Sequence, residues 1–362
     1  MKILAVETSC DETSIAVISA DQKSGNFKIL SNIVSSQIEI HQKWGGVVPN
    51  LAAREHLKNL MPVFNQALKE ANTKITDINL IAVTQGPGLI PALLLGINLA
   101  KTISYCEKKP LMGIHHLAGH IATNFAPDGK SGNIFAIQYP ALALVVSGGH
   151  TQLILIKKPG HFKIIGQTLD DAVGEAFDKV AKLLELGYPG GPIVSRLAEL
   201  AIADENNKFI LPRPLINKNN FDFSFSGLKT AVLYLWKKIE TDQERQMENK
   251  KNICQSFQVA CIEVLTKKTV KALQKYRPKS FLLAGGVAAN LALRNSLETS
   301  IKENFNDEIK IYFPPLALCG DNAAMIGLAA LENYLTGNFD QKILNENWKN
   351  LEADSNLNIE EL

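Results

Sequence analysis

Two histidines four residues apart are the first candidates for chemistry in this chain. His116 and His120 stand in the run His-His-Leu-Ala-Gly-His at 115–120. On an α-helix, residues i and i+4 lie on one face, so two imidazoles with this spacing can bind one divalent metal ion. The apolar run 111–114 predicts a strand just before them, and α/β proteins hold their sites at strand ends. Taken alone, the pair is also consistent with two unrelated histidines.

Asp321 is a candidate for a third ligand. It lies in the run 318–324, at an expected junction of strand and helix. An aspartate at such a junction is usually a helix N-cap. It could equally supply a hard oxygen ligand. Two imidazole nitrogens and one carboxylate oxygen, with coordination positions left over, would suit catalytic iron or zinc.

Two polar turns follow strand-like runs in the two halves of the chain. The first is Glu-Thr-Ser-Cys-Asp-Glu-Thr at 7–13, and the second is Ser-Gly-Gly-His-Thr at 147–151. Backbone N–H groups and hydroxyls in such turns cradle phosphate oxygens, and glycine allows a ligand to approach the backbone closely. Asp11 and Glu12 would repel a bare phosphate, so they indicate a bound cation, an orienting role, or hydrogen bonds to amides of the turn itself.

The repetition of strand, polar turn and strand suggests two related domains that face each other, although each unit alone would be an ordinary hairpin. A third segment, Ala-Gly-Gly-Val-Ala-Ala-Asn at 284–290, joins an apolar strand to a helix. Such a junction can accept a nucleotide base or ribose, with Asn290 as the polar contact. This signal is weak alone, because many strand-to-helix turns contain Gly-Gly.

Asp178 and the loop 188–192 are candidates for binding ribose hydroxyls. Asp178 is expected early on a helix, where a carboxylate would also interact favourably with the helix dipole. The two interpretations stay open at this point.

The elements that position these residues alternate between strand and helix, which predicts an α/β protein. Strand-like apolar runs occupy 3–6, 15–18, 80–83, 142–146, 153–156, 281–284 and 309–313. Helical spacing occupies 52–72, 90–105, 172–187, 192–204, 225–240, 252–276 and 320–335. The charged segment 240–252 is expected to be a solvated helix end or loop, and the acidic stretch from 345 has little to bury.

Composition narrows the class of protein. The chain has 362 residues, 46% of them apolar and 20% charged, which suits two globular domains. A net charge of +2 is not typical of a free-standing nucleic-acid binder. Five scattered cysteines without a C-x-x-C pair indicate a reducing compartment. No apolar run is long enough for a membrane span and the first residues resemble a strand rather than a signal peptide, so we expect a cytoplasmic protein.

Together these segments resemble one family, the universal tRNA threonylcarbamoyltransferases. The matching stretches follow the family's order over nearly the whole chain, at 7–13, 45–49, 85–89, 115–120, 146–151, 174–179, 188–192, 223–229, 284–290 and 320–324. The resemblance implies an α/β fold with two lobes of the actin/Hsp70/sugar-kinase (ASKHA) class, built from duplicated RNase H-like domains. The N-terminal lobe is expected at 1–113 with about 322–340, the C-terminal lobe at 114–321, and a peripheral tail at 341–362.

The resemblance also implies a reaction: transfer of a threonylcarbamoyl group from threonylcarbamoyl-AMP to N6 of adenosine 37 in tRNAs that read codons beginning with A. It implies one divalent metal per subunit, Fe²⁺ before Zn²⁺ or Mg²⁺. The implied metal ligands are His116, His120 and Asp321. The implied substrate-binding residues are Val145, Val146, Ser147, Gly148, Gly149, Asp178, Gly191 and Asn290. Asp11 or Glu12 is our candidate for orienting or deprotonating N6.

The chain departs from the family at one position. Bacterial relatives commonly carry Glu where this chain has Ala118. Residue i+2 faces away from the histidine pair on a helix, so the metal site is not affected. The position bears on a rival function, because a zinc protease of the His-x3-His type carries its general-base Glu beside the first histidine. Here that neighbour is Leu117, which argues against a metalloendopeptidase.

The implied partners are tRNA, an inactive paralogue that forms a heterodimer, and a small ATPase; no membrane is involved. Two groups of basic residues are candidates for contact with tRNA, namely Lys43, Arg54, His56 and Lys58, and Lys218, Lys229, Lys237 and Lys238. Any one of them is more simply a solvated side chain. A regulatory ATPase with the same fold remains the alternative function.

Overall fold

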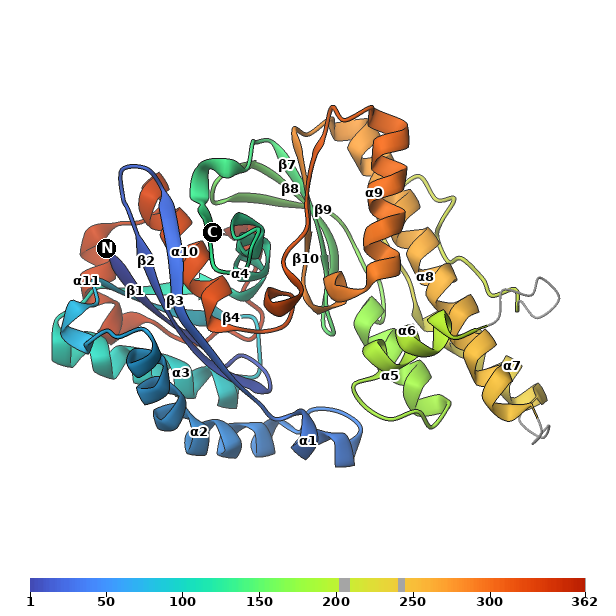
Figure 1. Ribbon diagram of the computed structural model, residues 1–362, viewed down its shortest axis with the longest axis horizontal. Coiled ribbons are helices and arrows are strands. Elements are labelled where there is room, and N and C mark those ends of the chain that lie inside the picture. The colour runs from blue at the N-terminus through green and yellow to red at the C-terminus, as the bar shows by residue number, and fades with distance from the viewer. Residues whose placement is uncertain (202–208, 240–244, 362) are drawn as a thin grey trace.

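A computed structural model describes residues 1–201, 209–239 and 245–361 of the chain. Figure 1 shows two β-sheets, each with helices packed against it. The ends of two expected helices, 192–204 and 225–240, and the start of the charged segment at 240 lie outside the described residues. Among the helices of the described part of the chain, none combines the length and hydropathy that a membrane span requires.

The two sheets repeat one strand order. The first runs β5-β4-β1-β2-β3-β6 and the second runs β11-β10-β7-β8-β9. In each, the central hairpin (β1–β2 or β7–β8) is antiparallel and the two strands beyond its first member are parallel to it. The strands are β1 Lys2–Glu7, β2 Glu12–Ala20, β3 Asn26–Ser36, β4 Leu80–Gly86, β5 Leu111–His115, β6 Ser131–Asn133, β7 Ala141–Val146, β8 Thr151–Lys158, β9 His161–Gln167, β10 Ser280–Ala284 and β11 Lys310–Tyr312.

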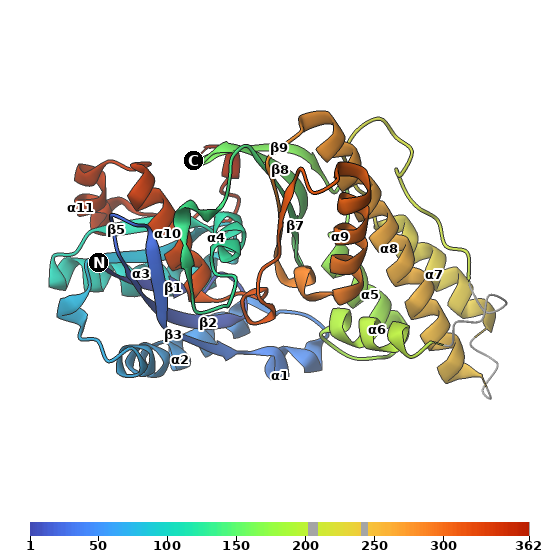
Figure 2. The ribbon, with the colours of Figure 1, turned by 45° about the horizontal axis from the view of Figure 1, so that its top comes forward.

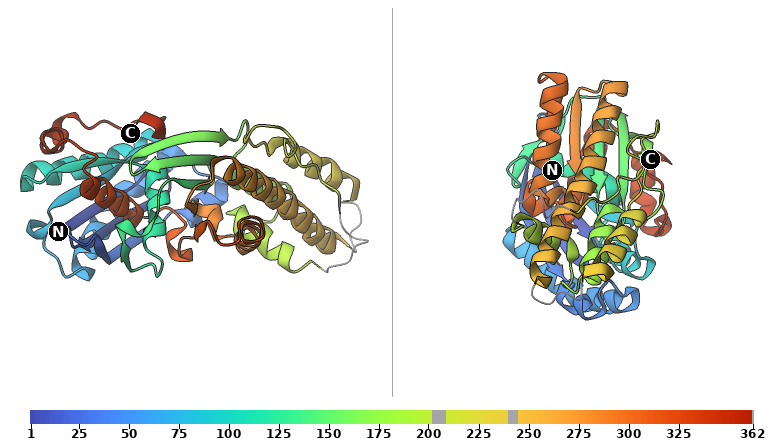
Figure 3. Two further views of the ribbon diagram at one scale, coloured as in Figure 1. Left: turned by 90° about the horizontal axis from the view of Figure 1, so that it is seen from above. Right: turned by 90° about the vertical axis from the view of Figure 1, so that its right-hand side faces the viewer.

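This repetition confirms the predicted α/β fold of two similar lobes. The helices of the described residues are α1 Ile38–His41, α2 Pro49–Glu70, α3 Ile90–Glu107, α4 His116–Ala122, α5 Val173–Leu183, α6 Gly190–Glu199, α7 Ser226–Ile239, α8 Gln246–Tyr276, α9 Leu291–Phe305, α10 Ala323–Thr336 and α11 Gln341–Asn350. Figures 2 and 3 show α7, α8 and α9 on the side of the second sheet that faces away from the first.

Both faces of the inner strands β1, β4, β7 and β10 are buried, which explains their nearly continuous apolar sequences. In β1, Leu4 packs with α2 and α3, whereas its neighbour Ile3 faces the middle of the molecule. In β7, Leu144 packs with the outer helices, whereas Ala143 faces the middle. The middle cluster therefore joins side chains of both sheets, and the helices α4 and α10 lie within it.

The C-terminal stretch is packed rather than free, so the expectation that it has little to bury is wrong. Helix α11 contacts α3 and β5, and Leu351 and Ile359 are buried. The Asp354 N–H donates to the Gln85 carbonyl of β4, and Glu360 accepts a hydrogen bond of 2.9 Å from the Ile164 N–H of β9. Its last residues thus contact both sheets.

The boundaries proposed for the lobes stay a prediction. The first sheet takes β5 up to His115 and β6 at Ser131–Asn133, while the second begins with β7. The charged segment 240–252 is mostly helical where it is described, because α8 begins at Gln246.

Glu332 on α10 makes the stability of the fold dependent on pH. Its side chain is buried, and its Oε1 accepts a hydrogen bond of 2.6 Å from the Tyr139 hydroxyl. Burial raises the pKa of Glu332 to about 7, although the bond from Tyr139 works against the shift. The folded protein thus holds a proton that the unfolded chain releases at lower pH, and the free energy of unfolding falls as pH rises through this range.

We expect the wild-type chain to lose up to about 3 kcal/mol of stability relative to Glu332→Gln between pH 4.5 and 8, since each unit of pKa shift corresponds to about 1.4 kcal/mol. Glutamine keeps an acceptor for Tyr139 but has no charge to desolvate. Urea unfolding at a series of pH values measures the difference. Identical pH slopes for the two proteins would contradict the assignment.

Candidate metal centre and substrate pocket

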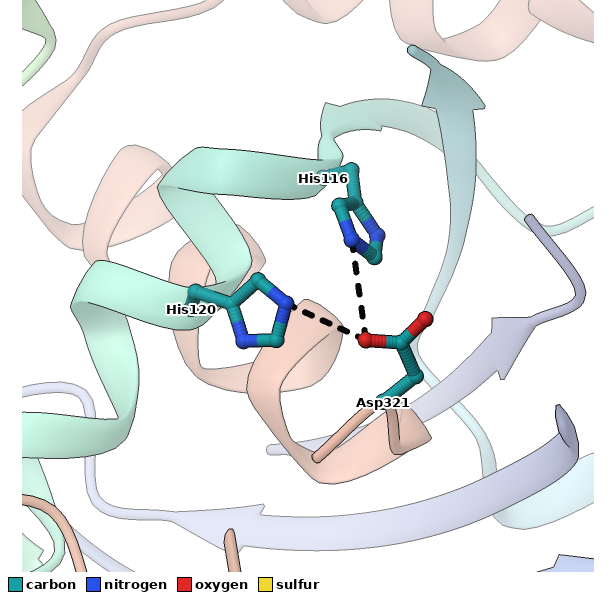
Figure 4. Close-up of side chains that lie close together, drawn as sticks. All are labelled: His116, His120 and Asp321. Atoms are coloured by element: carbon teal, nitrogen blue, oxygen red, sulfur yellow. Dashed lines mark ion pairs between the residues drawn. The ribbon is translucent and has the colours of Figure 1, made fainter. Parts of the chain in front are cut away.

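The histidine pair lies on one face of a helix that follows a strand end, as predicted. Helix α4 begins at His116 directly after β5 ends at His115. The His115 side chain caps it, because its Nδ1 accepts a hydrogen bond of 3.1 Å from the Leu117 N–H. Figure 4 shows the side chains of His116 and His120 converging on Asp321.

Asp321 is not the N-cap of α10. Asn322 takes that role, since its side chain accepts a hydrogen bond from the Met325 N–H. The Asp321 carboxylate is therefore left to face the histidines, with its Oδ1 at 3.1 Å from His120 Nε2 and 3.7 Å from His116 Nε2. One ligand atom from each residue lies within 4.8 Å of the other two. Two nitrogens and one oxygen at this spacing can bind one divalent ion.

The hydrogen-bonding state of His120 supports this role. Its ring is buried, and neither ring nitrogen has a hydrogen-bond partner among the described residues. A buried polar group without a partner costs about 1–3 kcal/mol. Nε2 nevertheless lies close to the Asp321 carboxylate. A metal ion held between the two would satisfy this nitrogen, so the donor set fits a divalent metal.

Glu7 and Ser9 hold the outer nitrogen of His116. The His116 Nδ1 lies 3.2 Å from Ser9 Oγ and 3.4 Å from Glu7 Oε2. A carboxylate at that nitrogen keeps the proton there and leaves Nε2 free for a metal, a common arrangement around metal-bound histidines. Thr84 donates to the same Glu7 oxygen, and all three partners are buried. Sequence reasoning missed this role of Glu7, whose only signal is a carboxylate that directly follows an apolar strand.

The histidines and carboxylates of this centre shift one another's pKa values. Burial works against the charged form of His116, but Asp321 and Glu7 outweigh it and raise the pKa of His116 to about 9. Burial also opposes ionisation of Asp321, yet His116 and His120 hold its pKa well below its usual range. In the absence of a metal the centre therefore holds a proton where the ion would bind.

The first polar turn lies against the same centre. Asp11 is buried, and Glu12 accepts a hydrogen bond of 3.1 Å from the Ser36 hydroxyl. Burial raises the pKa of Glu12 well above its usual range, and the negative charges of Asp321 and Asp11 raise it further. The three carboxylates Asp11, Glu12 and Asp321 are close enough to repel one another, which fits the expectation that the turn faces a cation.

His56 supports the turn from α2. Its Nδ1 lies 2.8 Å from Thr13 Oγ1 and its Nε2 lies 2.9 Å from the Cys10 carbonyl oxygen. The residue is fully buried. Its assignment to a basic surface for tRNA is therefore wrong; Lys43, Arg54 and Lys58, predicted with it, are exposed.

The predicted substrate residues gather partly around one cavity in the second lobe. Its volume is about 410 Å³, and it brings together four of the predicted residues, Gly148, Asp178, Gly191 and Asn290. At Gly148 and Gly191 a Cβ would meet no atom within 4 Å, so the backbone is open to a ligand. The Gly286 backbone of the strand-to-helix junction is equally open and lines the same cavity.

The remaining predicted residues lie beside this cavity. Val145 and Val146 are fully buried in β7, so their side chains belong to the core. The Ser147 hydroxyl accepts a hydrogen bond of 3.1 Å from the His150 N–H, and its carbonyl accepts one from Gly174. Gly149 is exposed, and a Cβ there would meet no atom within 4 Å.

The side chains of Asp178 and Asn290 form hydrogen bonds with other residues of the chain. Asp178 lies in the middle of α5, and its Oδ1 accepts a hydrogen bond of 2.7 Å from the Gly190 N–H at the start of α6. The expectation of a first-turn carboxylate is thus wrong for its own helix. Asn290 caps α9, and its Nδ2 donates to Ser195 and Gln258. Sequence reasoning missed these last two residues.

Charged groups of the metal centre and the first turn influence residues at and beside the cavity. Burial raises the pKa of Asp178, and the charge of Asp11 from the other lobe contributes to the shift. Burial, with the charges of His116 and His120, lowers the pKa of His150 to about 4. The two polar turns, the His-His-Asp group and the cavity therefore lie in one region.

Comparison with known proteins identifies relatives over almost the whole chain. The family model described as TsaD, tRNA N6-adenosine threonylcarbamoyltransferase, matches residues 28–328. The protein of that name from Persephonella marina is 48% identical over 337 residues, which are 92% of this chain and 90% of the relative. The one from Listeria monocytogenes strain CLIP80459 is 46% identical over 336 residues, 92% of each chain.

Solved structures share the fold at low sequence identity. Full-length HypF in its phosphate- and nucleotide-bound form is 12% identical, with a TM-score of 0.57, and the match covers 92% of this chain and 46% of that one. HypF from T. kodakarensis is 13% identical, with a TM-score of 0.56, over 95% of this chain and 49% of that one. This chain thus spans about half the length of HypF, and the similarity concerns the fold alone.

We expect His116→Ala, His120→Ala and Asp321→Ala each to weaken metal binding by at least tenfold, because each removes one of three ligands. Equilibrium dialysis against Zn²⁺, followed by elemental analysis, measures the loss. His161→Ala, which removes an exposed histidine outside the centre, serves as the control. Unchanged binding in any of the three ligand variants would refute its assignment.

Proposed function

The chain belongs to the tRNA N6-adenosine threonylcarbamoyltransferase family, and from this premise we propose that it transfers the threonylcarbamoyl group of threonylcarbamoyl-AMP to N6 of adenosine 37 in tRNAs that read codons beginning with A. The observation that carries the proposal is the match over residues 28–328, which include the His-His-Asp group and the residues of the glycine-lined cavity.

The proposed reaction forms one bond and breaks another. N6 of adenosine attacks the carbamoyl carbon of the mixed anhydride, the bond from that carbon to the phosphate oxygen breaks, AMP leaves, and N6 loses a proton. The anhydride is already activated, so binding and orientation of the two substrates supply much of the acceleration. The open backbone at Gly148, Gly191 and Gly286 would bind the AMP part, with Asp178 beside the ribose.

Asp11 and Glu12 are the proposed residues for N6. Both lie in the first turn, close enough to Asp321 for its charge to raise the pKa of Glu12. A carboxylate in this position can accept a hydrogen bond from the exocyclic amine and orient its lone pair toward the carbamoyl carbon. The same group can take the proton that N6 releases.

His116, His120 and Asp321 are the proposed ligands of one divalent metal. Imidazole nitrogens suit iron and zinc better than magnesium, and the family resemblance places Fe²⁺ before Zn²⁺. Bound there, the ion would supply Lewis-acid stabilisation of negative charge on the substrate's oxygens. Glu7 and Ser9 keep His116 oriented for this role.

We further propose a cytoplasmic location and three macromolecular partners, namely tRNA, an inactive paralogue and a small ATPase. The outer helices of the first lobe support a protein partner, since α2 exposes Leu57 and Met61 and α3 exposes Leu94. Exposed apolar side chains grouped on neighbouring helices are typical of a protein interface. Exposed Lys43 and Arg54 flank the loop 45–49 in sequence and are candidates for phosphate contacts.

The transfer reaction is tested by incubating the purified chain with synthetic threonylcarbamoyl-AMP and unmodified tRNA, with and without the two protein partners. We expect modified adenosine at position 37, detected by mass spectrometry of digested tRNA, together with one AMP per modification. ATP hydrolysis without modified tRNA under every condition would overturn the proposal in favour of a regulatory ATPase. Peptide cleavage lost in Asp321→Ala would favour a metalloendopeptidase.

We expect Asp11→Ala or Glu12→Ala, or both, to lower kcat for tRNA modification by about 100-fold or more, the usual contribution of a positioned acid or base. The exposed Glu39→Gln provides a control from the following helix, α1. Single-turnover measurements at saturating substrates give the rate. If both alanine variants kept near wild-type turnover, neither residue would be the proposed group.

A further inference from the structure

A second cavity lies behind the helix that carries the histidine pair. Its volume is about 520 Å³, and its walls come from β5, α4, the β8–β9 hairpin, α10 and the C-terminal stretch. Ala118 of α4 lines it. Because residue i+2 faces away from its neighbours at i and i+4, this cavity lies on the opposite face of α4 from the metal centre. Figure 2 shows α10 between α4 and α11.

A buried carboxyl group lines this cavity. Glu332 is only 8% exposed, and its Oε1 is occupied by the hydrogen bond from Tyr139. Among the described residues no side chain or N–H donates to its Oε2, and no Lys or Arg forms an ion pair with it. Above its pKa of about 7 this group is a carboxylate buried without a cation, which is unfavourable, so a donor from outside the protein would stabilise it there.

Two asparagines at the cavity also present acceptors. Asn338 uses its amide Nδ2 to donate to the Pro159 carbonyl and to Thr336, each at 3.0 Å. Asn347 uses its Nδ2 to donate to the Leu111 carbonyl at 2.7 Å. Because both NH₂ groups are committed to the protein, their Oδ1 atoms remain as acceptors, and within the described part of the chain nothing donates to them. The cavity is therefore rich in acceptors.

Above pH 7 the described residues of the lining carry two carboxylates and include no lysine or arginine. Asp340 joins Glu332 among them, and the exposed His161 also lines the cavity. Burial lowers the pKa of His115 to about 4, and both of its ring nitrogens are occupied, by the Leu357 carbonyl and the Leu117 N–H. Phe162 and Phe339 supply aromatic surface, whose faces attract cations.

From this arrangement we propose that the cavity behind α4 binds a small organic cation with a primary ammonium group. The ammonium donates to Glu332 Oε2 and to the amide oxygens of Asn338 and Asn347, while its apolar part packs against Phe162 and Phe339. The three donors of an ammonium group match the three acceptors that Glu332, Asn338 and Asn347 present. The site is separate from the proposed transfer reaction and does not depend on it.

Isothermal titration calorimetry with putrescine at pH 8 tests the proposal, and 1,4-butanediol is the neutral probe of equal length. We expect putrescine to bind the full-length chain at one site with a Kd below about 1 mM, and butanediol to give no binding. Glu332→Gln keeps the acceptor for Tyr139 and should weaken putrescine binding at least tenfold. Glu303→Gln, which removes an exposed carboxylate on α9, should leave it unchanged.

A second variant tests the location independently of charge. Ala118→Leu extends a side chain into the cavity and should abolish putrescine binding, while circular dichroism checks that each variant is folded. Three outcomes would overturn the proposal: no binding of putrescine to the wild-type chain, equal affinity in a folded Glu332→Gln variant, or butanediol binding as tightly as putrescine. Binding that survives Ala118→Leu would place the cation elsewhere and also refute the site.

Discussion

The contact between α4 and α10 is the constraint on which the site depends. Both helices lie in the core shared by the two sheets, where α4 carries the histidine pair and the segment before α10 carries Asp321. Their approach is close at Gly119, because a Cβ there would lie 2.8 Å from Ile326 Cδ1 and 3.2 Å from Met325 Cγ. Residues far apart in sequence thereby present their ligand atoms within 4.8 Å of one another.

Several carboxylates lie around this contact, and their negative charge favours the binding of a cation. Asp321 and Glu12 lie close enough for the charge of Asp321 to oppose the ionisation of Glu12, and Asp11 adds to the same field. A folded protein can bury several carboxylates close together when a cation or bound protons neutralise their charge. The protonated state of His116 provides that balance without a metal, and a divalent ion would provide it more fully. The same principle, in a milder form, applies to Glu332 behind α4.

Much of this arrangement could be predicted from local sequence. The i, i+4 spacing of His116 and His120, the repeated strand-turn-strand units and the apolar inner strands depend on neighbouring residues, and the structure has them as predicted. What failed depends on distant contacts. His56 is buried because it forms hydrogen bonds with the first turn, which is far away in sequence. Ile359 is buried because the C-terminal stretch packs against strands that are also distant in sequence. The role of Asp178 as acceptor for Gly190 depends on how α5 meets α6.

Anomalous diffraction from crystals grown with Zn²⁺, recorded on both sides of the zinc absorption edge, shows whether the His-His-Asp group binds a metal ion. We expect one strong anomalous peak between His116, His120 and Asp321, about 2.0–2.2 Å from two imidazole nitrogens and one carboxylate oxygen. A fully bound ion located elsewhere, or an ordered His-His-Asp group without any peak at saturating zinc, would contradict this assignment.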